Sequence, residues 1–295
     1  MHRLLAPAFL LISLAMLSGC RMNEAVYRQD GSRIIYMRPP LMRVVEELDE
    51  RHMAVNSVVA RLNVTLVDTE KNKEFALLGV YLGDKDGNMR YRITATGGQL
   101  VLDMGIHDES VDVWLPRKNR FFQGKEVDLL NNQSQLSLLA HCGACRDLFF
   151  PRAWTDTATE RRVTYNNGRE VVNVIEKPSF IRRRSRRLTL APETPTVESV
   201  EIYDRFGREV GTVRYGDYRF PDPDEQDAHA EGVGLTYPGK IILCSHDGVH
   251  RLEMQVEEVN INTDIDTAKF ALPTPENTKV LDLGSALKRA GNLWD

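Results

Sequence analysis

From residue 58 onward, apolar residues recur with a period of two, and short turns separate the apolar runs. Val58, Ala60 and Leu62 alternate with polar neighbours, and the alternation continues through Val64 and Leu66. This period is typical of a half-buried strand. Further strand-like runs cover residues 75–82, 89–96, 99–104, 111–115, 162–175, 199–204, 209–215, 240–245 and 251–257.

Glycine-containing dipeptides separate several of these runs. Asp86-Gly87, Asn167-Gly168 and Asp247-Gly248 each lie between strand-like residues, and Asn167-Gly168 divides the 162–175 run. Such dipeptides favour tight hairpins because they tolerate positive φ. Consecutive strands joined by tight turns predict an antiparallel meander and argue against a βαβ fold.

Two segments have helical periodicity instead. Pro39-Pro40 precede apolar residues at spacings of three and four through residue 55, which predicts a helix. Leu138, Cys142, Cys145 and Phe149 share one face of a second predicted helix between residues 132 and 150. Gly143 weakens its middle. We expect this helix to lie across the sheet as a lid.

The first twenty residues have the layout of an export signal. His2 and Arg3 precede an apolar run over 4–17, which is too short to span a bilayer. The run ends in Leu17-Ser18-Gly19-Cys20, which resembles the lipobox of bacterial lipoproteins. The resemblance implies cleavage between Gly19 and Cys20, with diacylglycerol and an N-acyl chain on Cys20. The alternative is an ordinary signal peptide with a cysteine near its cut site.

The residues after Cys20 continue this interpretation. Residues 20–38 are polar and aperiodic, which predicts a lipidated tether. Arg21, rather than an aspartate, follows the cysteine. By analogy with sorting in enteric bacteria, this favours an outer-membrane anchor facing the periplasm.

Two stretches carry a resemblance to a known family. Residues 111–124 combine an apolar strand, the turn Pro116-Arg117-Lys118-Asn119 and an aromatic strand that ends in glycine. Residues 259–280 combine an asparagine-bearing strand with a phenylalanine and a Pro-x-Pro exit. Together with the topology, they resemble the LolA/LolB-like superfamily of lipoprotein carriers and receptors.

The resemblance implies a mainly β fold with helices (α+β): an antiparallel, incompletely closed β-barrel wrapped on helices, around a hydrophobic cavity. We therefore expect four segments: a signal peptide over 1–19, a tether over 20–38, a half-barrel domain over 39–283 and a C-terminal tail over 284–295. The arginine-rich stretch 182–187 and the acidic segment 221–231 depart from compact family members, and we interpret them as insertions or long loops.

Charge and motif content narrow the function. The formal net charge is −4, and removing Arg3 with the leader makes it −5, so nothing predicts a nucleic-acid partner. We find no nucleophile elbow, zinc-protease pair or nucleotide fingerprint, and we assign no catalytic residue and no enzyme activity. We expect no cofactor beyond the acyl chains on Cys20, and we expect a monomer.

The cysteines leave several alternatives open. Cys142 and Cys145 are spaced Cys-x-x-Cys, which fits a packed core or a simple disulfide. The same spacing also fits a redox couple, or a metal site completed by His141 and Cys244. Neither a thioredoxin context nor a full zinc ligand set accompanies the pair, so we predict no metal site.

Three charged or glycine-bearing segments have competing interpretations. The basic run Arg182, Arg183, Arg184, Arg186 and Arg187 fits contact with anionic lipid headgroups, or a solvated strand edge that blocks aggregation. The 234–240 segment mimics a phosphate-binding loop but has Ile241 where Ser or Thr is required. Asp84, Asp86 and Asn88 resemble a calcium loop, although a hairpin turn explains them better.

The leading hypothesis is a lipoprotein that binds an acyl chain or another amphiphile in a hydrophobic cavity. Lipoprotein sorting or lipid transfer is the implied role, and the partners are membrane lipid, lipoprotein acyl chains or a periplasmic carrier. The alternative is a structural envelope lipoprotein that uses the same scaffold to bind a protein. The predicted cavity lining is Val64, Leu66, Leu77, Ile93, Leu102, Val113, Trp114, Leu138, Phe149 and Leu252.

Overall fold

The computed structural model describes residues 26–27, 33–34, 41–130, 146–151, 158–166, 169–176, 183–191, 196–204, 206–220 and 235–290. The chain divides into two compact units, Met1–Val44 and Val45–Asp295. In the first unit, strands β1 (Val26–Tyr27) and β2 (Arg33–Ile34) pair antiparallel. Helix α2 (Leu41–Ala54) begins there, directly after Pro39-Pro40, as the sequence predicts. No described helix is both long and apolar enough to cross a bilayer.

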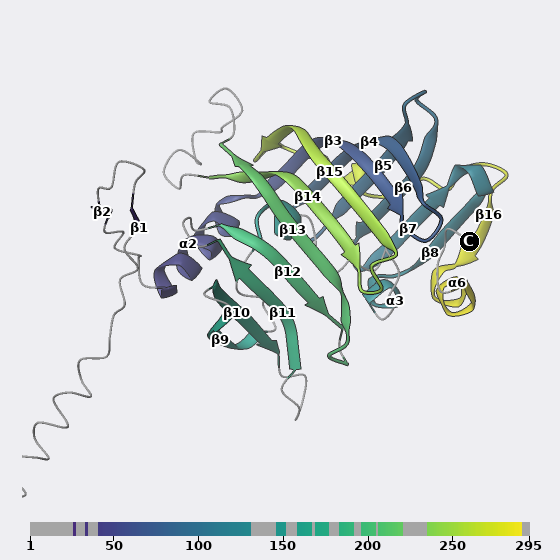
Figure 1. The fold of residues 1–295 in the computed structure, drawn as a ribbon. Coiled ribbons are helices and arrows are strands. Elements are labelled where there is room, and N and C mark those ends of the chain that lie inside the picture. The colour runs from purple at the N-terminus through teal and green to yellow at the C-terminus, as the bar shows by residue number, and fades with distance from the viewer. Residues whose placement is uncertain are drawn as a thin grey trace, which may run out of the picture. The chain divides into compact units, whose positions relative to one another are not determined.

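The second unit is built on one large sheet, and the predicted meander is confirmed (Figure 1). A first antiparallel run comprises β3 (Ser57–Asp68), β4 (Lys73–Asp84), β5 (Met89–Ala95), β6 (Leu100–His107), β7 (Ser110–Leu115) and β8 (Arg120–Lys125). A second comprises β9 (Ala158–Asn166), β10 (Arg169–Glu176), β11 (Arg183–Leu190), β12 (Val197–Tyr203), β13 (Glu209–Arg219), β14 (Tyr237–Ser245) and β15 (His250–Ile261).

The two meanders join where β3 pairs antiparallel with β15. The short strand β16 (Lys279–Asp282) then adds to β8 in parallel, so the described strands run in the order β16-β8-β7-β6-β5-β4-β3-β15-β14-β13-β12-β11-β10-β9. The two ends of this order do not pair with each other. This is the predicted incompletely closed antiparallel barrel, with one parallel strand that the sequence pattern does not predict.

Two of the three predicted glycine turns lie among the described residues, and Asn167-Gly168 lies outside them. Gly87 and Gly248 both have positive φ, at 98° and 71°, between antiparallel strands. The β6–β7 turn instead places Asp108 and Glu109 at positive φ without any glycine. Side chains tolerate that conformation poorly, so this turn is held by its surroundings. One contact is the backbone N–H of Glu126, which donates to the Glu109 carbonyl at 2.8 Å.

Short helices accompany the sheet: α3 (Glu126–Leu130), α5 (Arg146–Phe149), α6 (Leu283–Ala290), and the 3₁₀ turns η1 (Pro116–Lys118) and η3 (Thr267–Lys269). The predicted lid between 132 and 150 lies mostly outside the described residues, and only its end is seen, as α5. Helix α6 lies against β8 and buries Leu283 and Leu287, so the body extends beyond the predicted boundary at residue 283.

The closing segment crosses to the outer face of the sheet, which we define as the face opposite α5. Phe270 is fully buried there, and its carbonyl lies so close to Gly105 that no Cβ would fit. Asn119, which has a left-handed conformation after η1, donates through Nδ2 to the Asn277 carbonyl at 3.1 Å. The two stretches that resemble the family are therefore bonded to each other.

Candidate ligand-binding face

Eight of the predicted lining residues share the inner face, the face on which α5 lies. Directly paired residues of antiparallel strands point to the same side of a sheet. Val64 pairs with Leu77 and with Met254, and Leu66 pairs with Leu252. Ile93 pairs with Leu102 of β6. Met104 lies two residues after Leu102 in β6, on the same face, and pairs with Val113. Phe149 stacks on Tyr81 of this face, with ring centroids 5.1 Å apart.

The other two predicted lining residues are not on this face. Trp114 follows Val113 in β7, and successive strand residues point to opposite faces, so Trp114 lies on the outer face. It pairs there with Asp103 and Phe121. The prediction that both Val113 and Trp114 line one cavity is therefore wrong for Trp114. Leu138 lies outside the described residues.

The centre of the inner face is closed. Val64, Ile93, Leu102, Val113 and Phe149 are at most 4% exposed. A pocket whose lining is described lies among Leu48, Phe149 and Tyr218, and its volume is about 20 Å³. That is room for about one water molecule, whereas ligand pockets are usually several hundred Å³. A pocket of this size does not hold an alkyl chain.

One end of the inner face remains open. A single cross-strand row runs from Phe75 through Leu66 and Leu252 to Leu243. Exposure falls along this row: Phe75 is 47% exposed, Leu66 and Leu252 are half-buried, and Leu243 is 3% exposed. Leu77, two residues from Phe75 on the same face, is also half-buried. We call Phe75, Leu66, Leu77 and Leu252 the apolar rim.

A buried ionic cluster on the inner face was not predicted from the sequence. Asp147 of α5 is 6% exposed and binds the guanidinium of Arg186 from β11. His52 of α2, also buried, places Nδ1 2.8 Å from the Phe150 carbonyl and 3.4 Å from Asp147 Oδ1. Tyr215 donates to the Asp147 carbonyl at 3.3 Å. This cluster ties α5 to both α2 and the sheet.

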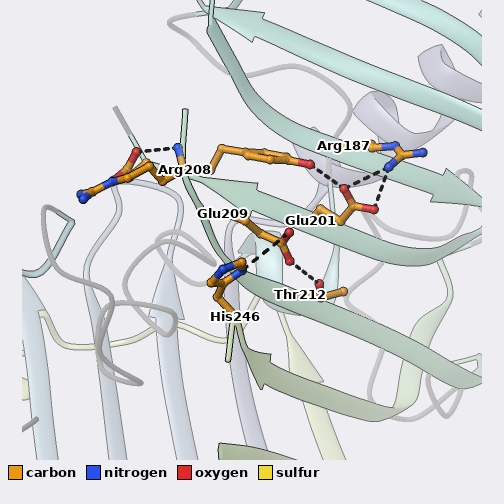
Figure 2. Close-up of polar contacts among 8 residues, drawn as sticks. Arg187, Glu201, Arg208, Glu209, Thr212 and His246 are labelled. Atoms are coloured by element: carbon orange, nitrogen blue, oxygen red, sulfur yellow. Dashed lines mark hydrogen bonds and ion pairs between the residues drawn. The ribbon is translucent and has the colours of Figure 1, made fainter. Parts of the chain in front are cut away.

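The arginine-rich run is an interior strand, not a loop or a sheet edge. β11 pairs with β10 on one side and with β12 on the other, so the predicted solvated edge is wrong. Arg186 points inward to Asp147, while Arg187 points outward to Glu201 at 3.0 Å (Figure 2). Arg183 and Arg184 begin the same strand, and Arg182 lies outside the described residues. The predicted contact with lipid headgroups therefore stays a prediction for Arg182, Arg183 and Arg184.

The outer face of β11–β13 carries a polar network around Glu201. Glu201 also accepts from the Tyr203 hydroxyl at 2.6 Å, and Glu209 contacts Thr212 and His246 nearby (Figure 2). At the β12–β13 turn, Asp204 accepts from the backbone N–H groups of Phe206 and Arg208. The burial of Asp204 alone would raise its pKa, but these bonds and the Arg208 guanidinium outweigh burial and lower it.

The remaining candidates from the sequence are the cysteines, a metal site and the calcium-like segment. Cys20, Gly19, Cys142 and Cys145 lie outside the described residues, and Cys244 is a half-buried free thiol in β14. The described residues contain no group of three His, Cys, Asp or Glu suited to a metal ion. Asp84 accepts from the backbone N–H groups of Asp86 and Asn88, which makes the calcium-like segment a hairpin turn.

The segment that mimics a phosphate-binding loop is also structural. Gly239 and Lys240 lie within β14, not at the start of a helix. A Cβ on Gly239 would meet the Asp217 carbonyl at 2.6 Å, so close packing between β14 and β13 requires this glycine. Residues 237–240 are therefore part of a strand and do not form the strand-to-helix turn of a phosphate-binding loop.

Comparisons with known proteins bear on the fold. Comparisons with family models and with curated proteins found no match. Among solved structures, a LolA superfamily protein from Nitrosomonas europaea matches with a TM-score of 0.51 and 14% identity, over 80% of this chain and 99% of that one. A DUF1329 family protein from Desulfovibrio piger matches with a TM-score of 0.48 and 8% identity, over 79% and 98%.

The first of these likenesses covers 99% of the related chain, and it agrees with the open antiparallel sheet described above. This chain therefore has the LolA/LolB-like fold.

Proposed function

We propose that this protein is an exported lipoprotein that binds an acyl chain, or another amphiphile with an alkyl chain, at the apolar rim of its inner face. The observation that carries the proposal is the exposure of Phe75, Leu66 and Leu252 on the face that the fold otherwise buries. An alkyl chain laid along this row would complete the core at that end.

The energetics support a reversible complex. Each buried methylene contributes about 0.8 kcal/mol, so a chain that covers only the rim gains a few kcal/mol from four or five methylenes. The closed centre, where Val64 and Ile93 are almost fully buried, limits how deep the chain can go without rearrangement. A carrier must release its cargo, and a shallow binding site releases a ligand more readily than a deep one.

The location follows from the same proposal. Acylation of Cys20 would hold the domain at a membrane through the 20–38 tether, and two or three acyl chains anchor a protein stably. Arg21 after the cysteine favours the outer membrane, facing the periplasm. Arg182, Arg183 and Arg184 remain the candidates for contact with anionic headgroups, since Arg186 and Arg187 bind carboxylates of the protein itself.

We infer a binding protein rather than an enzyme. Within the described residues, the buried Asp147 neutralises Arg186 and also lies beside His52. This pairing stabilises α5 on the sheet instead of presenting a reactive group to a substrate. Lipoprotein sorting or lipid transfer is the role that a monomeric carrier of this fold would serve.

A second candidate, a scaffold for a protein partner, has one observation in its favour. Leu78 and Val80 lie on the outer face of β4 and are 43% and 42% exposed. Val80 lies between Arg61 and Arg92, which are both exposed, so this strip combines apolar and cationic groups as protein interfaces do.

The two candidates are separated by a matched pair of substitutions in β4. Phe75→Glu changes the inner face, and Leu78→Glu changes the outer face at nearly equal exposure. The domain is prepared as residues 20–295 with Cys20→Ser behind a non-lipoprotein leader, and binding of octyl glucoside, an uncharged amphiphile with an alkyl chain, is titrated by calorimetry below its critical micelle concentration. A gain of a few kcal/mol at the rim corresponds to a dissociation constant near the millimolar range. Carriage predicts such binding in wild type and Leu78→Glu and its loss in Phe75→Glu. Absence of binding by the wild-type domain, or equal binding by both variants, would refute carriage.

A further inference from the structure

The β12–β13 hairpin carries an exposed aromatic side chain at its tip, where Phe206 is 54% exposed. Hydrogen bonds fix this turn: Asp204 accepts from the backbone N–H groups of Phe206 and Arg208 at 2.8 and 2.9 Å, and Gly207 has a φ of 76°. The Arg208 guanidinium lies 5.2 Å from the centroid of the Phe206 ring. The fold therefore presents a ring and a cation together at one fixed point.

A single exposed apolar side chain is ordinary, so the position of this tip decides its meaning. The cross-strand row of the apolar rim continues from Leu243 to Val213 of β13, and β13 leads back from Val213 to the tip. The β3–β4 and β14–β15 turns lie beyond the same row, and the backbone N–H of Thr69 donates to the Val249 carbonyl between them. The tip at Phe206 is therefore at the same end of the sheet as the apolar rim (Figure 1).

The basic start of β11 lies at this end as well. Arg186 pairs with Ile202, so the residues before Arg186 lie level with those after Ile202, which lead to the tip. Arg183 and Arg184 occupy these positions in β11. This corner of the sheet therefore brings cationic residues of one strand next to the hairpin that carries the exposed ring.

The chemistry of this corner fits the surface of an anionic bilayer. An aromatic ring gains apolar burial at the boundary between headgroups and acyl chains, and basic residues are attracted to anionic lipid. Arg208 is bound to Asp204 but is 55% exposed, and a guanidinium has five N–H groups, so donors remain for a phosphate oxygen. A bilayer is also the source of the acyl ligand, and the open rim lies at this same end.

We propose that the tip of the β12–β13 hairpin docks the domain on an anionic lipid bilayer, with the Phe206 ring inserted at the interface and Arg208 and the basic start of β11 beside the phosphate groups. The inference rests on the proposed function for the location of the domain at a membrane. It goes further by naming the end of the sheet that meets the bilayer and the lipid charge that this end selects. The apolar rim then faces the bilayer from which an acyl chain enters.

The test is co-sedimentation of residues 20–295 carrying Cys20→Ser with sucrose-loaded vesicles, so that the acyl anchor does not contribute. One set of vesicles contains phosphatidylethanolamine and phosphatidylglycerol in equal amounts, and the other contains phosphatidylcholine alone. Wild type should bind the anionic vesicles at least about fivefold more tightly than the neutral ones, as one basic residue near the surface predicts. Phe206→Ser should weaken binding to the anionic vesicles by about four- to tenfold, because about half of the side chain is left to bury.

Phe220 supplies a matched control. It follows β13 directly, so it lies at the opposite end of that strand from Phe206, and it is 71% exposed. Phe220→Ser should leave vesicle binding unchanged, and Phe206→Leu, which keeps an apolar side chain, should bind like wild type. Equal weakening by Phe206→Ser and Phe220→Ser, no weakening by Phe206→Ser, or equal binding of wild type to both kinds of vesicle would overturn the docking role.

Failure of docking and failure of carriage are distinguishable. Phe206→Ser should leave the calorimetric binding of octyl glucoside unchanged, since the tip is not part of the apolar rim, whereas Phe75→Glu should abolish it. Wild type that binds octyl glucoside but no vesicles refutes docking and leaves carriage standing. Wild type that binds anionic vesicles through Phe206 but no octyl glucoside refutes carriage and supports docking.

Discussion

Replacing Gly105 by alanine should undock the closing segment from the outer face. Gly105 lies in β6, and a Cβ at this position would be 2.3 Å from the Phe270 carbonyl oxygen and 2.5 Å from Leu272 Cδ1. Ordinary contacts of a Cβ begin at 3.4 Å, so the Phe270 backbone must retreat by about 1 Å. The retreat is opposed by Arg90, whose Nη1 donates to the Lys269 carbonyl at 2.9 Å.

The expected loss follows from what that segment buries. Phe270 is 0% and Leu272 7% exposed, and full exposure of two such side chains costs about 3–6 kcal/mol. A gap of up to 1 Å forfeits a quarter to a half of the contact energy. We therefore expect Gly105→Ala to lower the free energy of unfolding by about 1–3 kcal/mol.

The assay is urea unfolding of residues 20–295 with Cys20→Ser, followed by far-ultraviolet circular dichroism. Gly216→Ala in β13 is the matched control, because a Cβ there meets nothing within 4 Å and its φ is not positive. The control should be neutral or slightly stabilising, since alanine restricts the unfolded chain more than glycine does. Similar midpoints for the two variants would refute the reasoning about the closing segment.

Two further predictions concern buried carboxylates. Arg90 binds Asp103 through two bonds of 2.9 and 2.8 Å, and Asp103 is almost fully buried, so Arg90→Met should cost about 3 kcal/mol by removing both of these hydrogen bonds from a buried charge. The control Arg92→Met, an exposed side chain 3.9 Å from Asp103, should cost less than about 1 kcal/mol, and equal losses in urea would contradict the role of burial. Asp204 has a lowered folded pKa, so its charge stabilises the fold above its ordinary pKa of 3.8, and this contribution disappears as the pH falls through the folded pKa. Asp204→Asn should therefore be destabilised relative to wild type by about 1 kcal/mol more at pH 7 than at pH 2, and a pH-independent difference would contradict the shift.

The sequence predicts the meander because turn chemistry and period agree at most hairpins. Gly87 and Gly248 have the positive φ that their dipeptides favour. The Asp108-Glu109 turn carries no such signal, since neighbouring contacts hold it. The parallel strand β16 could not be predicted either. It has only four residues, with a charged residue at each end, and this is too short to show an alternating pattern.

The charged strand β11 shows why patterning fails at ion pairs. Five arginines in six residues indicate a loop or an edge, because unpaired charges are excluded from an interior strand. In the structure, Arg186 binds a carboxylate of α5 and Arg187 binds a carboxylate of β12. Both partners lie outside the arginine-rich run, so the run alone does not reveal them. Periodicity also cannot decide which of two apolar neighbours faces inward, and so Val113 and Trp114 were both assigned to the cavity.

The exposure gradient along one row distinguishes packing from binding better than composition does. Phe75, Leu66, Leu252 and Leu243 are all apolar and cross-strand neighbours, so their sequence pattern is the same. Only the coverage differs, from 47% exposed at Phe75 to 3% at Leu243. About half of the Phe75 side chain is already buried, so only its exposed half adds nothing to folding. Under the proposed function, a ligand at the apolar rim would supply the apolar surface that this half lacks, and the Phe75→Glu variant tests that step directly.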